Sequence, residues 1–294
     1  MQRRFPHFHS RRSSAWAALM LSLSLPSCDQ DMAAEADPML VVEGWIDDGG
    51  FPIVMLSETV PISSRYQDIS SLGQYMIRWG KVTVDNGERE IVLTGRSAAD
   101  FLPPYVYTTG EMRGEVGKVY TVRVEYGDYE AVARTTILPA TPIDSFAVQP
   151  SAAGDSTYIL MAYFQASSDE HVHYKVFTNV NTPTGMFLTP QQSLLNGRLA
   201  DGRTEMPIYR SVAVDDTIRT PYFFRNDTVG IKFTTVDDAA YHCWDQFCQS
   251  IHFSRSPFFP STFNIPGNVE GAFGTWFGYG ARYYYIAIAD LLEE

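Results

Sequence analysis

The sequence predicts a mainly β protein, with an N-terminal immunoglobulin- or transthyretin-like β-sandwich followed by a second β-rich domain that contains one helix. Short runs rich in β-branched and aromatic residues recur from residue 39 onward, separated by Gly, Pro, Asn and Asp. Helical periodicity is found at residues 237–253. A proline-containing segment at residues 138–146 separates two groups of strands. We therefore expect domains at residues 38–139 and 140–294.

Residues 1–27 are expected to form a signal peptide that is not part of the fold. The segment begins with "MQRRFPHFHSRR", which carries four arginines and no acid, and continues with the short apolar run "SSAWAALMLSLSL". This run is too short for a comfortable membrane-spanning helix. No later stretch approaches about 18 uninterrupted apolar residues, so no other spanning helix is expected.

Cys28 is the predicted lipidation site. Leu25 lies three residues before it and the small Ser27 lies directly before it, as in the lipobox of bacterial lipoproteins, although Pro26 departs from the preferred residues. The Cys28 thiol would form a thioether with diacylglycerol, whose acyl chains include fatty acids such as palmitate. The alternative is an ordinary secretory signal, with Cys28 as an unmodified thiol.

The acidic balance of the chain excludes some partners. Without the four N-terminal arginines, Lys+Arg falls from 22 to 18 against 34 acids, which gives a net charge of −16. Nucleic-acid binding needs a basic surface, and so does electrostatic docking on anionic lipid. We therefore expect neither, and we interpret the polar residues 28–37 as a tether between the lipid and the first domain.

The first domain is predicted from alternating strands joined by tight turns. In residues 118–126 the alternate residues Tyr120, Val122 and Val124 face one side, and Gly127-Asp128 then forms a two-residue hairpin. Asp85-Asn86-Gly87 connects another pair in the same way. Strands are expected at residues 39–46, 52–59, 80–84, 88–95, 118–126 and 129–138.

The second domain is predicted to hold further strands and the helix. Ala240, Trp244, Phe247 and Ile251 form an apolar helical stripe that begins near Asp237. Cys243 and Cys248 border this stripe, and on a regular helix they lie too far apart for a disulfide, so we expect two core thiols. Strands are expected at residues 157–165, 171–180, 205–214, 229–236 and 283–289, with long loops at 181–204 and 254–275.

Three segments resemble a known family. They are "LVVEGWIDDGGFPIVMLSETVPIS" at 40–63, "GKVYTVRVEYGDYEAVARTTILPATPIDSF" at 117–146 and "NVEGAFGTWFGYGA" at 268–281. Their order and spacing resemble the Bacteroidota lipoprotein family called domain of unknown function 4249. Two features depart from the family pattern: the acidic pair Asp47-Asp48 and the pair of cysteines Cys243 and Cys248.

The resemblance implies a lipoprotein of the outer membrane, exposed at the cell surface and often encoded beside TonB-dependent transporters. It implies no defined activity. Asp29 and Asp31, just after Cys28, resemble the acidic signals that direct such lipoproteins to the cell surface.

His171 and His173 are the candidate metal ligands. On a strand they would point to the same face, where Glu170, His242 or His252 could add a third ligand for zinc or copper. The alternative, which we favour, is a polar strand start facing water. We therefore expect neither a metal nor another cofactor.

Trp276, Phe277 and Tyr279 are the candidate ligand-binding residues. They stand between glycines and could form a stacking platform for a sugar or peptide. We favour the alternative that they close a core, because alternate residues of 283–289 also need a buried face.

Other candidate sites have simpler explanations. Asp47 and Asp48 could bind calcium, but Asp and Gly here favour a hairpin turn. His242 and Cys243 could form a nucleophilic pair, but adjacent helical residues point about 100° apart. The common hydrolase, metalloprotease and nucleotide-binding motifs are absent, so we expect no enzyme. O-glycosylation acceptors are predicted at Ser156, Thr217 and Thr228.

These observations predict a non-enzymatic lipoprotein, anchored in outer-membrane lipid through Cys28 and facing the extracellular side. We expect it to bind a small ligand (a glycan, peptide or metal complex) or to assist a TonB-dependent barrel transporter. The alternatives are a surface adhesin or structural envelope protein, and a surface enzyme that processes glycans or peptides.

Overall fold

The computed structural model describes residues 37–59, 73–101, 103–182, 185–190, 192–200, 202–212, 220–254 and 265–293. These residues are mainly in strands, which confirms the predicted fold class. Cys28 and Thr217 lie outside the described residues. Within the described residues, no helix is long and apolar enough to cross a membrane.

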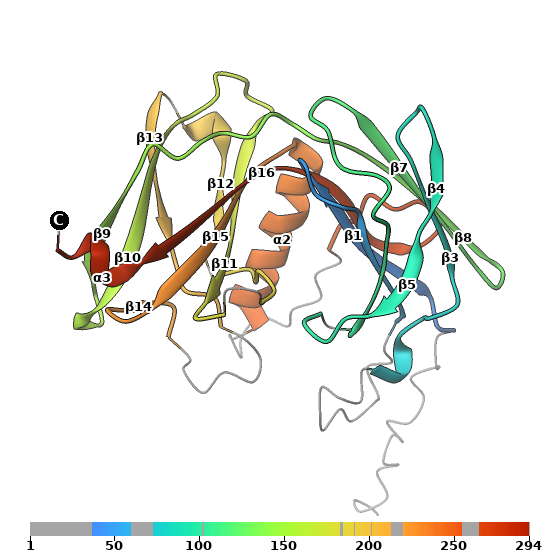
Figure 1. The fold of residues 1–294 in the computed structure, drawn as a ribbon, viewed down its shortest axis with the longest axis horizontal. Helices are drawn as coiled ribbons and strands as arrows, with labels where there is room; N and C mark the ends of the chain where they lie inside the picture. The colour runs from blue at the N-terminus through green and yellow to red at the C-terminus, as the bar shows by residue number, and fades with distance from the viewer. Residues whose placement is uncertain are drawn as a thin grey trace, which may run out of the picture. The chain divides into compact units, whose positions relative to one another are not determined.

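The largest sheet has eight strands, which come from both the N-terminal and the C-terminal half of the chain (Figure 1). Its long strand β16, Phe273–Ala287, first pairs in parallel with β1, Leu40–Asp47, and then antiparallel with β15, Thr228–Val236. The strand order is β12-β11-β15-β16-β1-β2-β6-β5. The other members are β12 (Leu194–Leu195), β11 (His173–Val180), β2 (Ile53–Glu58), β6 (Tyr105–Thr108) and β5 (Thr94–Ser97).

Glycines let β16 pass close to its neighbours. Gly274 has a φ of 115°, and a Cβ there would lie 1.8 Å from the carbonyl oxygen of Val42 on β1. A Cβ at Gly280 would lie 2.2 Å from the Leu138 oxygen. These contacts explain the glycine spacing of the "GTWFGYGA" segment, since any larger residue would force the backbones apart.

A four-stranded sheet covers the N-terminal part of the large sheet. Its order is β4-β3-β7-β8. The strands are β4 (Glu90–Val92), β3 (Lys81–Asp85), β7 (Val119–Tyr126) and β8 (Tyr129–Thr136). The predicted alternation in β7 is confirmed for Tyr120, Val122 and Val124, which are buried in the core between the two sheets together with Trp276. The hairpin glycines Gly87 and Gly127 have positive φ angles of 83° and 56°.

A second four-stranded sheet covers the C-terminal part. It has the order β13-β10-β14, with β9 also paired to β10. The strands are β13 (Arg203–Ile208), β10 (Gly154–Gln165), β14 (Phe223–Phe224) and β9 (Ser145–Ser151). Their shared core contains three aromatic rings, Phe164, Tyr174 and Phe233, with centroids 4.8–5.6 Å apart.

The predicted helix is α2, Asp238–Ser254, and it lies on the large sheet on the face opposite the second four-stranded sheet. Short helical elements that were not predicted include η2, Gly197–Leu199, and α3, Ile288–Leu291. The last strand ends at Ala287, where α3 begins. The boundary between residues 139 and 140 stays a prediction. Strand β16 contributes residues to the hydrophobic cores of both predicted domains. The described chain from Pro38 onward is one compact unit.

Candidate functional site

Lysines and aromatic rings share the sheet face that α2 covers. Alternate residues of a strand point to opposite faces, so Lys175 and Phe177 on β11 lie on the same side, next to Lys232 on β15. Tyr279 on β16 belongs to the same cluster as Phe177 and Trp244 of α2. Lys175 is 0% exposed and Lys232 is 5% exposed. We call these five residues, Lys175, Phe177, Lys232, Trp244 and Tyr279, the lysine–aromatic face. Fully buried lysines are uncommon in proteins.

Lys232 has a carboxylate partner from the other half of the chain. Its Nζ lies 2.7 Å from Oδ1 of Asp47 and donates a hydrogen bond of 2.8 Å to Oδ2. The Tyr283 hydroxyl donates to the same Oδ2 at 2.6 Å. Burial lowers the pKa of Lys232, and the Asp47 charge partly offsets this. Burial and the nearby Asp47 charge also raise the pKa of Tyr283, which keeps its phenol neutral.

Lys175 has no carboxylate within ion-pair distance among the described residues. Its Nζ donates to the Val176 carbonyl at 3.0 Å and to the Ser193 hydroxyl at 2.5 Å. It also lies 4.4 Å from the ring centroid of Phe177 and 4.7 Å from that of Trp244. Burial lowers the pKa of Lys175 to about 7, so this amine gives up its proton far more easily than a surface lysine.

The helix above this face carries the two cysteines. Both are free, as expected, with Cys243 buried and Cys248 half-buried. Burial raises the pKa of Cys243 to about 11, so at neutral pH the group is a thiol and not a thiolate nucleophile. Trp244 Nε1 donates to the Tyr279 hydroxyl at 3.1 Å, which ties α2 to β16. This environment fits the expectation of core thiols.

His171 and His173 both bind the carboxylate of Asp238 in the first turn of α2. His171 Nδ1 is 2.5 Å from Oδ2, and His173 Nε2 is 2.9 Å from Oδ1. His173 Nδ1 accepts a hydrogen bond of 3.0 Å from the Gly197 amide, so its Nε2 carries the proton donated to Asp238. Both ring nitrogens of His173 are therefore in use. Within the described parts of the chain, no three His, Cys, Asp or Glu side chains are placed to hold a metal ion.

The histidines instead fasten the turn before β11 to α2. Hydrogen bonds from His173 and then His171 lower the pKa of Asp238 to about 2, and the same carboxylate raises the pKa of His171. The raised His171 pKa adds stability that is complete below the unfolded value of 6.5 and is lost as pH rises through the folded value. The lowered Asp238 pKa adds stability that is present above 3.8 and is lost as pH falls toward 2.

We therefore expect Asp238→Asn to return the His171 pKa toward 6.5. The reason is that the amide removes the negative charge that holds the imidazolium. NMR titration of the His171 ring protons, assigned with His171→Gln, measures this. Asp245→Asn, farther along α2, is the matched control and should leave the titration unchanged. An unchanged His171 titration in Asp238→Asn would contradict the pairing.

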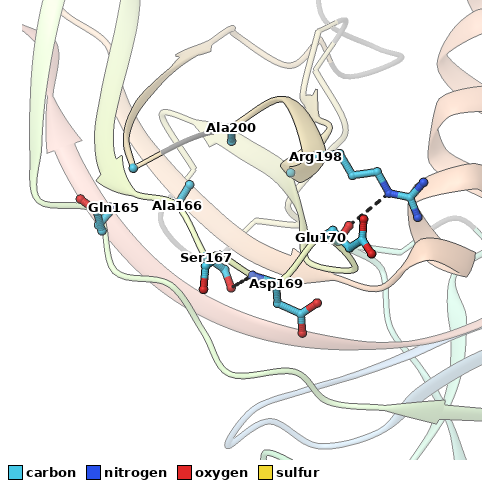
Figure 2. A pocket seen from close by; sticks show the side chains of 10 residues that line it. Gln165, Ala166, Ser167, Asp169, Glu170, Arg198 and Ala200 are labelled. Carbon is cyan, nitrogen blue, oxygen red and sulfur yellow. Dashed lines mark hydrogen bonds between the residues drawn. The ribbon is translucent and has the colours of Figure 1, made fainter.

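A polar pocket lies beside this turn, with a volume of about 500 Å³ (Figure 2). Its lining consists of residues 165–170 together with Gly197, Arg198, Ala200 and Gly202. Arg198 donates through Nε to the Glu170 carbonyl at 3.3 Å and through a terminal nitrogen to Asp238 at 3.2 Å. The amide of Asp169 donates to the Ser167 hydroxyl at 3.1 Å. The pocket therefore offers hydroxyl, carboxylate and guanidinium groups on a wall held to α2.

The three aromatic candidates of the glycine-rich segment are buried. Trp276 is 0% exposed and donates from Nε1 to the Tyr120 carbonyl at 3.0 Å, while Phe277 and Tyr279 are each 3% exposed. A stacking platform needs exposed ring surface, which these three rings do not have. They contribute instead to two hydrophobic cores, as in the interpretation that we favoured. The exposed rings of β16 are instead Phe273, at 45%, at its start, and Tyr283, at 45%, and Tyr285, at 58%, near its end.

Asp47 and Asp48 form a turn, the explanation that we favoured over calcium. Gly50 donates its amide to the Asp47 carbonyl at 2.9 Å, and Gly49 has a φ of 70°. The Asp47 carboxylate faces Lys232, which would repel a cation. Sequence reasoning missed Lys175 and Lys232, although "YKVF" and "GIKF" each place a lysine inside an apolar run. Ser156 and Thr228 are exposed, as glycosylation acceptors must be.

These features define a β-sandwich protein with a helix-covered, charged sheet face. The model of one family, Domain of unknown function (DUF4249), matches residues 27–283, and the chain belongs to that family. No curated protein matches the chain.

Proposed function

We propose that this protein is a non-enzymatic lipoprotein, anchored in the outer membrane through Cys28, that binds a ligand for a TonB-dependent barrel transporter. The observation that carries the proposal is the position of Cys28. It ends an apolar signal-like segment, the family match begins beside it at residue 27, and the first strand follows at Leu40. A lipid on Cys28 would thus hold the folded part to the membrane by a short tether.

The polar pocket supports a role in ligand binding. Its volume of about 500 Å³ lies within the range of about 300–1,000 Å³ that is usual for small-molecule sites. The chemistry of the candidate groups supports a non-enzymatic role, because the Cys243 thiol is protonated at neutral pH and both nitrogens of His173 are occupied.

The anchor predicts a specific effect of Cys28→Ser. We expect the unaltered protein to fractionate with the outer membrane and to carry a thioether-linked diacylglycerol on Cys28, because the thiol is the acceptor. The Ser variant should lose the lipid and leave the membrane fraction. Fractionation and mass spectrometry of the mature N-terminus measure this, with Cys248→Ser as the matched control. An unmodified Cys28 in a soluble mature chain would refute the anchor.

The partner is tested by purifying the tagged protein from its own membrane. Co-purification of a barrel transporter is the expected result. Recovery with filaments or matrix components, and no transporter, would favour the adhesin or structural alternative. Hydrolysis of surface glycans or peptides by the purified protein would favour the enzyme alternative.

A further inference from the structure

Three aromatic rings lie together at the open end of the lysine–aromatic face. Tyr283 and Tyr285 are 45% and 58% exposed, and they point to the same side of β16 because they are two residues apart. Phe187, which is half-buried, meets Tyr283 edge to face with ring centroids 5.5 Å apart. We call these three residues the aromatic platform.

Buried polar groups fix the orientation of Tyr283. Its hydroxyl donates to Asp47 Oδ2 at 2.6 Å, and the same oxygen accepts a hydrogen bond from Lys232. One end of the ring is thus held inside the protein while part of its surface faces solvent. A ring that is already ordered loses little conformational entropy when a ligand stacks on it.

A glycine leaves room for a polar group beside Tyr285. Gly230 is the cross-strand partner of Tyr285, and a Cβ there would lie 2.3 Å from Asn179 Oδ1 and 3.2 Å from Tyr285 Cε1. The Asn179 side chain therefore fills the space above this glycine, where it is 3% exposed and donates from Nδ2 to the Gly185 carbonyl at 3.1 Å. The ring of Tyr285 is thus supported by an ordered, buried side chain, and its exposed surface is open to a stacking ligand.

Size and charge decide between a glycan and a protein partner. At 45% and 58% exposure, the two tyrosines offer roughly 200 Å² of open surface, against about 800 Å² per partner in a stable protein interface. Beneath the platform the charges of Asp47 and Lys232 compensate each other, so this pair offers no unpaired charge to an ionic ligand. Both observations favour a short, neutral ligand.

We propose that the aromatic platform binds a neutral glycan chain, with successive sugar rings stacking on Tyr283 and Tyr285. Side chains two residues apart on a strand are about 6.6–6.8 Å apart, which suits neighbouring units of an extended chain. This inference rests on the proposed ligand-binding function, but it places the ligand at a site separate from the polar pocket and names the ligand class of that site.

The test measures binding of the detergent-solubilised full lipoprotein to laminarin, mannan, dextran and xyloglucan, with polygalacturonate as the anionic comparison. We expect at least one neutral glycan to bind and polygalacturonate to bind more weakly. Tyr285→Ala should weaken binding at least tenfold, because it removes one stacking surface. Tyr283→Phe keeps its ring and should stay within about threefold of the unaltered protein. Trp79→Ala, at a residue 89% exposed, is the matched control and should bind normally.

Circular dichroism and thermal unfolding show whether each variant is folded. The proposal is overturned if none of the four neutral glycans binds, or if folded Tyr285→Ala binds as tightly as the unaltered protein. Either result leaves lipidation and transporter co-purification to be judged by their own experiments. Conversely, glycan binding by a protein without a lipid or a barrel partner would refute the proposed function and not this site.

Discussion

Asp47→Asn is expected to lower the free energy of unfolding by about 3–5 kcal/mol, which is the usual cost of leaving one member of a buried ion pair without its partner. Asp47 and Lys232 are almost fully buried, and the carboxylate lies 2.7 Å from the ammonium group. An amide at position 47 keeps the shape but removes the charge that compensates Lys232. Urea unfolding at pH 7 measures the loss.

Matched variants separate the ion pair from simple packing. Lys232→Met should also destabilise the protein, because it leaves the Asp47 carboxylate buried without a cation. The double variant Asp47→Asn with Lys232→Met removes both charges and should recover most of the loss. If the double variant equals the sum of the singles, the pair is not coupled and the explanation is wrong.

Lys175→Met is expected to have the opposite effect and to raise the free energy of unfolding by about 2–4 kcal/mol at pH 7. Lys175 is fully buried beside Phe177 and Trp244, and its nearest polar partners are neutral oxygen atoms. Methionine has a similar length, fills the same space and has no ammonium group to dehydrate. Urea unfolding of the two proteins in parallel measures the gain.

The pH dependence identifies the cause of this gain. The folded pKa of about 7 lies below the ordinary value of 10.5, so between these values the unfolded chain holds a proton that the folded chain has lost. The stability of the unaltered protein therefore includes a contribution from Lys175 that rises with pH across this window. The advantage of Lys175→Met should be complete below pH 7 and should shrink as pH rises toward 10.5.

Lys81→Met is the matched control for the lysine substitution. Lys81 is about half exposed and pairs with Glu125 on the surface. Surface pairs contribute little, so this variant should keep the unfolding profile of the unaltered protein across the same pH range. An advantage of Lys175→Met that is independent of pH would show that the amine is not the source of the effect.

Lys232, unlike Lys175, also connects stability with the aromatic platform. Lys232 orients Asp47, and Asp47 orients Tyr283 of the aromatic platform. Asp47→Asn should lower stability but change glycan binding by no more than the roughly threefold change expected of Tyr283→Phe, which loses the same hydrogen bond. Lys175→Met, which does not touch the platform, should leave binding unchanged.

Local patterns in the sequence predicted many of the strands, the hairpins and the helix, but missed β6, β9, β12, β14 and the first half of β16. The alternation in residues 118–126 and the turn at Gly127 predicted β7 and its hairpin correctly. The stripe at Ala240 and Trp244 predicted α2 within one residue of its start. These signals depend on a residue and its near neighbours along the chain, so they can be read without knowing the partners. The family motifs were also recognisable, because their order along the chain carries the resemblance.

The partners of charged and aromatic side chains were decided only by the tertiary structure. Asp47 and Lys232 are 185 residues apart, and His173 and Asp238 are 65 apart, so no local pattern links them. The local pattern was equally unable to show which aromatic residues of β16 are buried. Its alternation predicted two faces, but only the packing against β1, β15 and α2 buries Tyr279 and leaves Tyr283 and Tyr285 exposed. Burial depends on which elements pack together, and that is a property of the whole fold.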